Sequence, residues 1–393
     1  MLLMRGVFGM HKATAVCFGL QEPHPSVEPP ACTGGFRDLS RVADAMAAEE
    51  INGMRPHVVV DLNGWTAGHR AGVLASRPAR LQVQYMGFPA TTGASYIDFA
   101  VSDRFVTPPE LRPAYSEAML LMPVTYFVSD YGSIKALAGA DDFAAVSEEQ
   151  IQGSGSGVTM CNHDSHHKFD QQRFRSWMDA IDEAKGAAGE RARLELLRQG
   201  GGSERSILRE AETRGVEVRF VERVSFGSHM QRIRGCGVAV DTDGICGHTT
   251  AANYLYSRVP MVTRATEHQV GRVAAGLILA LSQHCGEAAA GIVRVEAEFA
   301  RAASRIAAGS HSVDEIRSTP ATAAQASFRS GARSMRATIE RCLERAVRDR
   351  AGVWDTGRWV RNWESGLRMA LETHDFGFKA KGKRGDSMNV IVS

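Results

Sequence analysis

Short apolar runs alternate with helical patterns along most of this chain, and this alternation constrains the fold more than any other feature. The first series has apolar runs at Ala13–Leu20, His57–Leu62, Leu81–Met86 and Ile97–Val101, and helical patterns at Ser40–Met54 and Gly68–Arg77. Apolar runs flanked by helical patterns indicate parallel strands that helices cover on both faces. The sequence therefore predicts an α/β fold.

A second, more regular series follows the first. Its apolar runs are Val158–Cys161, Val216–Val221, Gly237–Asp241 and Pro260–Thr263, and its helical patterns are Gln171–Glu183, Ser228–Arg234, Thr249–Ser257 and His268–Leu281. Strands and helices that alternate through short turns are typical of a doubly wound, Rossmann-like sheet. We expect ligands to bind at the carboxyl ends of such strands.

The length of the chain allows two such domains. It has 393 residues, 44% of them hydrophobic, and a domain takes roughly 100–200 residues. Gln152–Gly157 (QGSGSG) has no side chains that a core needs and is the best linker candidate. The predicted parts are a Rossmann-like half at 1–150, a second at 158–310, C-terminal helices at 311–375 and a basic flexible tail at 376–393. Two such halves predict a cleft between the carboxyl ends of their sheets.

Charge and cysteine usage narrow the classes of function. The chain has 46 basic and 44 acidic residues, so no net field favours nucleic acid or an anionic membrane surface. No apolar run approaches the ~18 residues of a membrane-spanning helix. The seven cysteines are scattered without a C-x-x-C pair, which favours buried thiols over a disulfide framework or a zinc site. We therefore expect a cytoplasmic or nuclear protein with no membrane and no nucleic-acid partner.

The segment Asp241–Thr250 (DTDGICGHTT) is the clearest candidate for a binding site. A strand ends at Asp241, a glycine-containing turn follows, and Thr249 and Thr250 stand where the next helix begins. Backbone amides and hydroxyl groups at a helix N-terminus bind anions such as a diphosphate, and His248 can donate a further hydrogen bond. The same segment also fits an ordinary threonine-capped helix after a glycine turn, so both interpretations stay open.

The segment Cys161–Asp170 (CNHDSHHKFD) joins another strand to its helix. Lys168 is expected near the helix entry, where a cation can meet a phosphate group, a contact worth roughly 4 kcal/mol at ~4 Å and an effective dielectric near 20 before desolvation. His163, His166 and His167 with Asp164 match no established spacing of metal ligands, so we expect no metal. A plain polar loop is the alternative.

The segment His57–Arg70 (HVVVDLNGWTAGHR) runs from a strand into an Asn-Gly turn, as active-site loops of α/β enzymes do. Arg77-Pro78 and Gln84–Gly93 (QYMGFPATTG) follow it. On their own, these proline and glycine residues only mark turns.

Together these segments resemble the catalytic region of protein O-GlcNAc transferases, glycosyltransferase family 41. Similar segments follow in the family's order over nearly the whole chain: D-L-N-G-W-T, R-P-A-R-L-Q, G-F-P-A-T-T-G, Tyr115–Glu117 with Met122–Phe127, Cys161-Asn162 with Lys168, Asp241-Thr242, Gly247–Thr250, Pro260–Thr263, Arg272 and Asp355–Trp359. A shared order of this length is far more specific than any single motif.

The resemblance implies a GT-B fold in which residues 1–150 form the catalytic half and 158–310 bind the nucleotide sugar. It also implies inverting, metal-independent transfer of N-acetylglucosamine from UDP-N-acetylglucosamine to Ser or Thr hydroxyls of intracellular proteins, with no cofactor besides this donor. The positions that match the family's site are Lys168 and His57 as catalytic groups, and Lys168, His229, Arg232, His248, Thr249, Thr250 and Asn253 as contacts to the nucleotide sugar.

By the same resemblance, Lys168 holds the diphosphate, while His229 and Arg232 contact uracil. The chemistry agrees, because UDP gains negative charge as it leaves and a preorganised cation stabilises that charge.

Several positions depart from the family's pattern. Met1–His11 aligns just after the family's His-Pro-x-x-His segment, so we expect this chain to lack that segment, its proposed base and the family's tetratricopeptide repeats. Asn253 stands where the family has an Asp on the ribose, Phe226 where it has Lys, and Ser165 where it has Gln. The alternatives are a protein O-fucosyltransferase that uses GDP-fucose, a catalytically inactive nucleotide-sugar-binding paralogue, and a transferase for non-protein acceptors.

Overall fold

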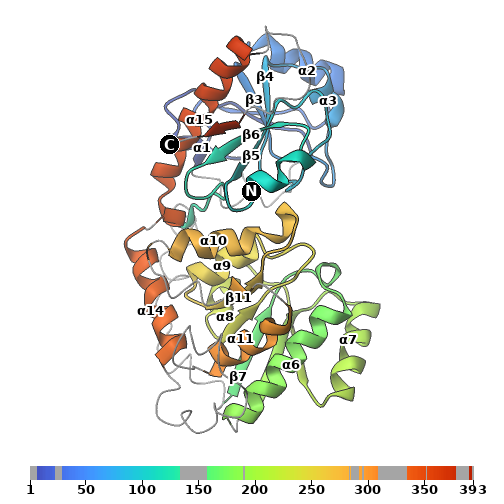
Figure 1. Cartoon of the computed structure of the whole chain (residues 1–393). Coiled ribbons are helices and arrows are strands. Elements are labelled where there is room, and N and C mark those ends of the chain that lie inside the picture. The colour runs from blue at the N-terminus through green and yellow to red at the C-terminus, as the bar shows by residue number, and fades with distance from the viewer. Residues whose placement is uncertain are drawn as a thin grey trace. The chain divides into compact units, whose positions relative to one another are not determined.

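The computed structural model describes residues 7–22, 29–132, 157–188, 191–282, 284, 292–293, 296–308, 334–350, 352–377 and 389–391. The chain divides into two compact units, Met1–Ile134 with Val353–Ser393 (unit 1) and Lys135–Gly352 (unit 2), and each contains a parallel sheet (Figure 1). Most of the predicted linker, residues 152–156, and residues 311–333 of the predicted C-terminal helices lie outside the described residues.

The main sheet of unit 1 has five parallel strands in the order β13-β6-β5-β4-β3. Their bounds are β3 Val58–Asp61, β4 Leu81–Gln84, β5 Phe99–Asp103, β6 Ala118–Met122 and β13 Asn389–Ile391. Strands β4 and β5 are buried along their whole length, because helices and loops cover both faces. β1 (Cys17–Gly19) pairs with β2 (Phe36–Asp38) outside this sheet, so the predicted strand Ala13–Leu20 is short and separate.

The helices of unit 1 are α1 (Val7–Met10), α2 (Asp44–Gly53), α3 (Ala71–Ala75) and α15 (Thr356–Gly377). Aromatic side chains hold α15 against the sheet. The rings of Trp359 and Trp363 stack with centroids 5.3 Å apart, and the Tyr85 ring lies 4.8 Å from that of Trp363. The Tyr85 hydroxyl also donates to the carbonyl of Tyr126 at 2.8 Å. Burying such large rings anchors the helix to unit 1.

Two C-terminal parts therefore differ from the expected boundaries. α14 (Ser334–Arg348) belongs to unit 2 and α15 to unit 1, so the predicted helical part at 311–375 is divided between the units. The predicted flexible tail contains β13, in which Val390 pairs with Leu120 of β6. The β-branched side chains of Val390 and Ile391 favour an extended backbone at this sheet edge.

The sheet of unit 2 has six parallel strands in the order β12-β11-β10-β7-β8-β9. Their bounds are β7 Gly157–Asn162, β8 Arg191–Leu197, β9 Glu217–Val221, β10 Val238–Val240, β11 Met261–Arg264 and β12 Ile292–Val293. From β9 to β12 this is the 3-2-1-4-5-6 order of dinucleotide-binding folds, in which the winding reverses between strands 1 and 4. In this chain the reversal lies between β7 and β10.

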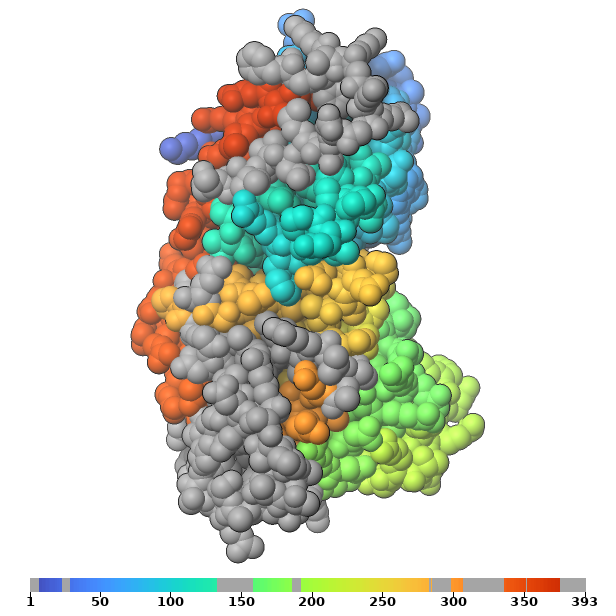
Figure 2. All heavy atoms as spheres, in the orientation of Figure 1, coloured from blue at the N-terminus to red at the C-terminus, as the bar shows by residue number. Residues whose placement is uncertain are grey.

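The helices of unit 2 are α6 (Gln171–Ala188), α7 (Gly202–Thr213), α8 (Phe226–Ile233), α9 (Thr249–Tyr256), α10 (Val273–Ser282), α11 (Glu296–Ala308) and α14. Parallel crossovers are right-handed, so the reversal places α6 and α7 on one face of the sheet and α9 and α10 on the other. α11 packs on α6. Figure 2 shows α6 and α7 as the green and yellow-green flank of this unit.

Strand β8 was not predicted, although it lies inside the sheet between β7 and β9. Its sequence, RARLELL, consists of residues with high helix propensity. Pairing on both sides and burial of Leu194 and Leu196 override that propensity.

The expectation of free thiols is wrong. Disulfides link Cys17 to Cys32 and Cys161 to Cys236, and Cys342 is also disulfide-bonded. Among the described cysteines, only the buried Cys246 is free. Cys161 and Cys236 are 75 residues apart in sequence, yet their Cα atoms lie 5.9 Å apart because β7 and β10 are neighbours. Scattered spacing therefore did not exclude disulfides, and it gives no support for a reducing compartment. Among the described residues, no helix has the length and apolar character needed to cross a bilayer.

Candidate functional site

The candidate site of unit 2 lies where the winding of its sheet reverses. β7 ends at Asn162 and β10 at Val240, and the two strands are hydrogen-bonded neighbours. Asn162 Nδ2 donates to the Val240 carbonyl at 2.7 Å and ties the two strand ends together. In open α/β sheets, ligands bind outside the carboxyl ends of the strands at this reversal. Both predicted segments, Cys161–Asp170 and Asp241–Thr250, pass through this place.

Asp241 shapes the turn between β10 and α9. Its buried carboxylate accepts the backbone N–H of Gly247 at 2.7 Å, the N–H of Thr242 at 2.8 Å and the hydroxyl of Thr263 at 2.6 Å. Burial raises the pKa of Asp241 to about 7; the nearby Asp164 carboxylate adds to the rise and the hydrogen bonds oppose it. A Cβ atom at Gly247 would lie 3.0 Å from Asp164 Oδ2, so glycine permits the close approach of the two loops.

α9 begins at Thr249, directly after this turn. His248 is its N-cap residue, and no side chain caps the helix. The first amides of an α-helix have no acceptor within the helix, so Thr249, Thr250 and Ala251 present their N–H groups at the N-terminus. The helix dipole adds positive potential there. Such a terminus can hold a phosphate group.

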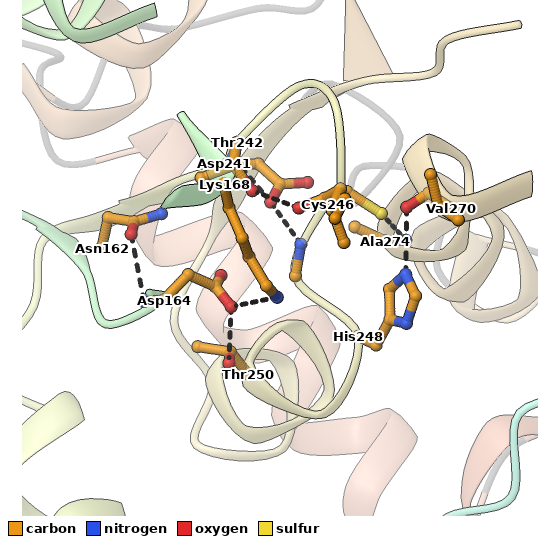
Figure 3. Close-up of polar contacts among 12 residues, drawn as sticks. Asn162, Asp164, Lys168, Asp241, Thr242, Cys246, His248, Thr250, Val270 and Ala274 are labelled. Carbon is orange, nitrogen blue, oxygen red and sulfur yellow. Dashed lines mark hydrogen bonds and ion pairs between the residues drawn. The ribbon is translucent and has the colours of Figure 1, made fainter. Parts of the chain in front are cut away.

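Lys168 is held at this helix N-terminus by Asp164 (Figure 3). Its Nζ atom lies 2.7 Å from Asp164 Oδ1, and the Thr250 hydroxyl donates to the same oxygen at 3.1 Å. The backbone of Asp164 is fixed as well, since its N–H donates to Asn162 Oδ1 and its carbonyl accepts from Gln199 Nε2, both at 3.1 Å. The structure therefore brings Lys168 and Thr250 together, with a carboxylate between them for which the sequence predicted no role.

The side chain of His248 differs from the donor that the sequence suggested. Its Nε2 atom lies 3.0 Å from the Val270 carbonyl, and burial lowers the pKa of His248 to about 4 (Figure 3). The ring is therefore neutral at pH 7, and its single N–H, on Nε2, is donated to Val270. The other ring nitrogen can only accept, so in this arrangement the side chain of His248 cannot donate to a phosphate.

His229 and Arg232 lie on α8, which follows the carboxyl end of β9. The His229 ring centroid is 5.5 Å from that of His163. Burial, together with the neighbouring His163 and Arg232, lowers the pKa of His229 to about 4. Arg232 Nη1 donates to the carbonyl of Glu222 at 2.6 Å. Asn253 lies one turn into α9 and is buried. Four predicted nucleotide contacts lie outside the start of α9, and all of them belong to unit 2: Lys168, His229, Arg232 and Asn253.

His57 is the predicted site residue that lies outside unit 2. It belongs to unit 1 and is exposed at the amino end of β3, where its carbonyl accepts the N–H of Leu81. The carboxyl end of β3 carries Asp61, which accepts the N–H groups of Asn63 at 2.9 Å and Gly64 at 3.0 Å and whose pKa burial raises. Ligands bind at the carboxyl ends of such strands, whereas His57 stands at the amino end, and its catalytic role stays a prediction.

Glu117 joins two sequence segments of unit 1. This buried carboxylate accepts the backbone N–H of Thr92 at 2.6 Å, the hydroxyl of Thr91 at 2.7 Å and the hydroxyl of Ser116 at 3.1 Å. Trp65 Nε1 also donates to the Thr92 carbonyl at 2.8 Å. The G-F-P-A-T-T-G and Y-S-E segments therefore form one hydrogen-bonded structure, which no local pattern in the sequence predicted.

The histidines of the CNHDSHHKFD segment separate in the fold. His166 lies with Nε2 2.9 Å from the Leu197 carbonyl and Nδ1 3.0 Å from the Ser203 hydroxyl, whereas His167 is exposed. His163 lies beside Cys161 and Glu195. Among the described residues, this last group is the only set of His, Cys, Asp or Glu side chains placed so that it could hold a metal ion.

Comparison with known proteins gives the family. The sequence profile of glycosyl transferase family 41 matches residues 27–138 and 141–330. The chain belongs to glycosyl transferase family 41. The resemblance found in the sequence is thereby confirmed, and this family is one of glycosyltransferases.

Two plant relatives show how much of a longer protein the chain represents. The Arabidopsis thaliana protein named probable UDP-N-acetylglucosamine–peptide N-acetylglucosaminyltransferase SEC is 32% identical over 289 residues, covering 71% of this chain and 29% of the relative. The SPINDLY protein of the same plant, named for the same activity, is 24% identical over 254 residues, covering 61% of this chain and 26% of the relative. The chain thus spans less than a third of either relative.

A solved structure confirms the predicted fold. A mutant of the Thermobaculum terrenum O-GlcNAc transferase aligns with a TM-score of 0.71 at 19% identity, covering 94% of this chain and 65% of the other. With the two parallel α/β sheets described above, this shows the GT-B fold of the family.

Proposed function

We propose that unit 2 binds UDP-N-acetylglucosamine, and that the chain transfers N-acetylglucosamine to Ser or Thr hydroxyls of intracellular proteins, with inversion and without a metal. The observation that carries the proposal is the meeting of Lys168 and the α9 N-terminus at the reversal of a Rossmann-like sheet. The names of the SEC and SPINDLY relatives support this donor and a peptide acceptor.

The proposed transfer breaks the bond between the sugar C1 and the phosphate oxygen and forms a bond between C1 and the acceptor oxygen, whose proton passes to a base. Negative charge then grows on the departing UDP. The Lys168 ammonium and the N–H groups of Thr249 and Thr250 are placed to stabilise this charge. Each preorganised contact of this kind is typically worth ~10²–10³ in rate.

The nucleoside end of the donor is proposed to lie against α8 and α9. The neutral ring of His229 and the guanidinium of Arg232 offer hydrogen bonds to a uracil edge, and Asn253 is proposed to contact the ribose. The His163 ring, 5.5 Å from that of His229, connects these contacts to the loop that carries Lys168.

A second candidate function is binding of the nucleotide sugar without transfer, and Asp164 favours it. Its carboxylate accepts hydrogen bonds from Lys168 Nζ and from the Thr250 hydroxyl, two of the groups proposed to hold the diphosphate. A diphosphate therefore has to displace a buried carboxylate of its own sign, which weakens donor binding.

Thermal unfolding of the full chain with UDP, GDP and UDP-N-acetylglucosamine in parallel tests the donor. A ligand at 100 times its Kd stabilises the folded state by about 2.7 kcal/mol. Stabilisation by UDP and not by GDP is expected, whereas a preference for GDP points to O-fucosyl transfer. A cooperatively unfolding sample that responds to none of them contradicts donor binding.

Incubation with radiolabelled UDP-N-acetylglucosamine and a Ser/Thr-rich peptide then separates the two candidates. Label in the peptide supports transfer, and UDP binding without label in the peptide supports the second candidate.

A further inference from the structure

Three donor side chains of different chemistry meet beneath the reversal of the unit 2 sheet. One ligand atom from each of Cys161, His163 and Glu195 lies within 4.8 Å of the others, and all three residues are buried. His163 also lies beside His229 of the proposed donor site, whereas Cys161 and Glu195 are not assigned to that site.

Strand pairing explains why these residues meet. Cys161 on β7 pairs in parallel register with Glu195 on β8, so their side chains lie side by side on the same face of the sheet. His163 comes two residues after Cys161, and successive side chains along a strand alternate between faces. The set is therefore built on two neighbouring strands of the core.

One nitrogen of His163 lacks a hydrogen-bonding partner. His163 Nε2 lies 3.2 Å from Glu195 Oε1, whereas the buried Nδ1 has no partner among the described residues. If Nε2 carries the proton that Glu195 accepts, Nδ1 holds a bare lone pair in the core, which is costly without a partner.

The carboxylate of Glu195 is a suitable anionic donor. Its side chain is only 9% exposed, and its Oε1 atom lies 3.2 Å from His163 Nε2, so the carboxylate faces the other members of the set.

Cys161 has an alternative partner, because its sulfur is bonded to that of Cys236. We propose that, when this disulfide is reduced, Cys161, His163 and Glu195 bind a divalent transition-metal ion of the zinc class, with the released Cys236 sulfur as an adjoining fourth donor. Reduction takes two electrons and two protons from a dithiol, which itself becomes a disulfide. Metal binding then displaces the protons of the ligating thiols.

The donor set selects the class of ion. Thiolate, imidazole and carboxylate together suit zinc, whereas magnesium and calcium prefer oxygen donors alone. Zinc bonds of about 2.0–2.3 Å in a tetrahedron place neighbouring donor atoms roughly 3.3–3.8 Å apart. His163 Nε2 and Glu195 Oε1 are already 3.2 Å apart, and the ligand atoms of all three residues lie within 4.8 Å of one another. Small side-chain movements therefore close the site.

This ion has a structural role and takes no part in the proposed transfer. It fixes His163, whose next neighbour in the chain is Asp164, and the loop that continues to Lys168. The disulfide and the ion are mutually exclusive at Cys161, so each redox state has its own cross-link between the strands. The inference stands on the donor set alone and does not depend on the proposed function.

Cobalt titration of the full chain tests the site directly. Co²⁺ replaces Zn²⁺ in such sites and gives an intense thiolate-to-metal absorption band together with visible bands of tetrahedral cobalt. The chain reduced with a phosphine, which does not compete for the metal, is expected to take up a single Co²⁺ with these bands, and Zn²⁺ is expected to displace it. The oxidised chain is expected to show no thiolate band.

Matched variants assign the ligands. The double variant Cys161→Ser/Cys236→Ser is expected to abolish the thiolate band, Cys161→Ser alone to weaken it, and His163→Phe and Glu195→Gln to weaken Co²⁺ binding. Cys246→Ser and His167→Phe are controls, because Cys246 is the free buried cysteine and His167 is exposed outside the set. Cooperative thermal unfolding of each variant shows that it is folded, and the isosteric Glu195→Gln serves if His163→Phe does not fold.

Two outcomes overturn the proposal. One is a reduced, folded chain that binds no Co²⁺. The other is a thiolate band that survives the loss of both Cys161 and Cys236, or that disappears equally in Cys246→Ser. Because the readout is metal absorption, it is independent of whether UDP stabilises the chain, so failure of this site and failure of the proposed function are distinguishable.

Discussion

Asp164 of unit 2 differs in its partners from the carboxylates that hold loops in either unit. In unit 1, Asp61 and Glu117 accept backbone N–H and hydroxyl groups from the loops that they hold. In unit 2, Asp241 does the same for the turn before α9. Asp164, in contrast, accepts from Lys168, a flexible cation whose side chain is 19% exposed. A ligand cannot replace the backbone N–H groups of a loop, but it can replace one partner of an ion pair.

This difference separates carboxylates that maintain the fold from one that competes for the site. Removing a carboxylate that holds a loop leaves several buried donors unpaired, which costs stability. Removing Asp164 frees a cation and a hydroxyl at a helix N-terminus, which is a gain for an anionic ligand. The predictions below test this contrast.

The largest effect is expected for Lys168→Ala. Loss of the cation at the departing diphosphate is expected to lower kcat by ~10²–10³ in a peptide transfer assay. Lys185→Ala is the control. Lys185 lies near the end of α6, its ammonium group is 3.0 Å from the Gly215 carbonyl, and it has no part in the site. If Lys168 only balances the charge of Asp164, transfer will survive its removal, and the contrast between the two kinds of carboxylate fails.

Glu117→Ala is expected to reduce stability without changing UDP binding. The donors of Thr91, Thr92 and Ser116 lose their acceptor, at a cost of about 1–3 kcal/mol in the free energy of unfolding. Urea denaturation measures this cost, and calorimetry measures the affinity for UDP. The control is Glu50→Ala, which removes an exposed ion pair with Arg37 and is expected to change stability by less than about 0.5 kcal/mol. A fall in UDP affinity in Glu117→Ala would show that Glu117 contributes to ligand binding and does not only hold a loop.

Asp164→Asn is expected to tighten UDP binding by about tenfold. Two unit charges ~4 Å apart at an effective dielectric near 20 interact by roughly 4 kcal/mol. The expected gain is smaller than this, because solvent and Lys168 screen the repulsion between Asp164 and the diphosphate. The amide keeps the shape of the side chain and removes its charge. Titration calorimetry with UDP measures the change. The control is Asp179→Asn, because Asp179 lies on α6 and forms an exposed ion pair with Arg214. Unchanged binding shows that Asp164 does not compete with the ligand, and weaker binding shows that Asp164 helps to hold it.

Asp241→Asn is expected to change the pH dependence of stability. With a folded-state pKa of about 7 against an ordinary 3.8, folded Asp241 keeps a proton that the unfolded chain releases between these values. Its contribution to the free energy of unfolding is therefore complete below pH 3.8 and is lost as the pH rises through 7. His229 and His248, with pKa values lowered to about 4, act in the opposite direction up to their ordinary 6.5, so the difference between variant and wild type is the measured quantity.

Urea denaturation of both proteins at several pH values between 4 and 8 gives this difference. The wild type is expected to lose stability relative to Asp241→Asn as the pH rises. Parallel curves for the two proteins would show that Asp241 is ionised throughout this range.

The sequence predicts the fold well where pattern and propensity agree. The apolar runs that end at Cys161 and Asp241 became neighbouring strands, and their loops meet at the reversal of the sheet as parallel topology requires. β8 was missed because its helix-favouring residues are overruled by pairing on both sides. The disulfide between Cys161 and Cys236 was missed because it depends on which strands are neighbours, which spacing alone does not give.

The sequence predicts the site less completely. It placed Lys168 near the start of α6 and Thr250 at the start of α9, because strand–loop–helix order is enough for that. It did not predict that Asp164 joins them, since this contact spans 86 residues between two loops. Nor did it predict the tautomer of His248, which the Val270 carbonyl, 22 residues away, determines. The roles of these side chains depend on hydrogen-bonding partners that only the folded chain brings together.

The smallest effect is expected for His57→Ala, although the family resemblance gives His57 a catalytic role. Its ring is exposed at the amino end of β3, whereas the polar groups that could meet a ligand follow the carboxyl ends. Stability is expected to change by less than about 0.5 kcal/mol, as for other exposed positions, and the transfer rate to stay near that of the wild type. The transfer assay used for Lys168→Ala measures this. A fall in transfer rate by the ~10²–10⁴ typical of a missing general base would show that the amino edge of the unit 1 sheet reaches the acceptor. In that case, a position at the carboxyl end of a strand would not be what distinguishes functional from structural groups in this chain.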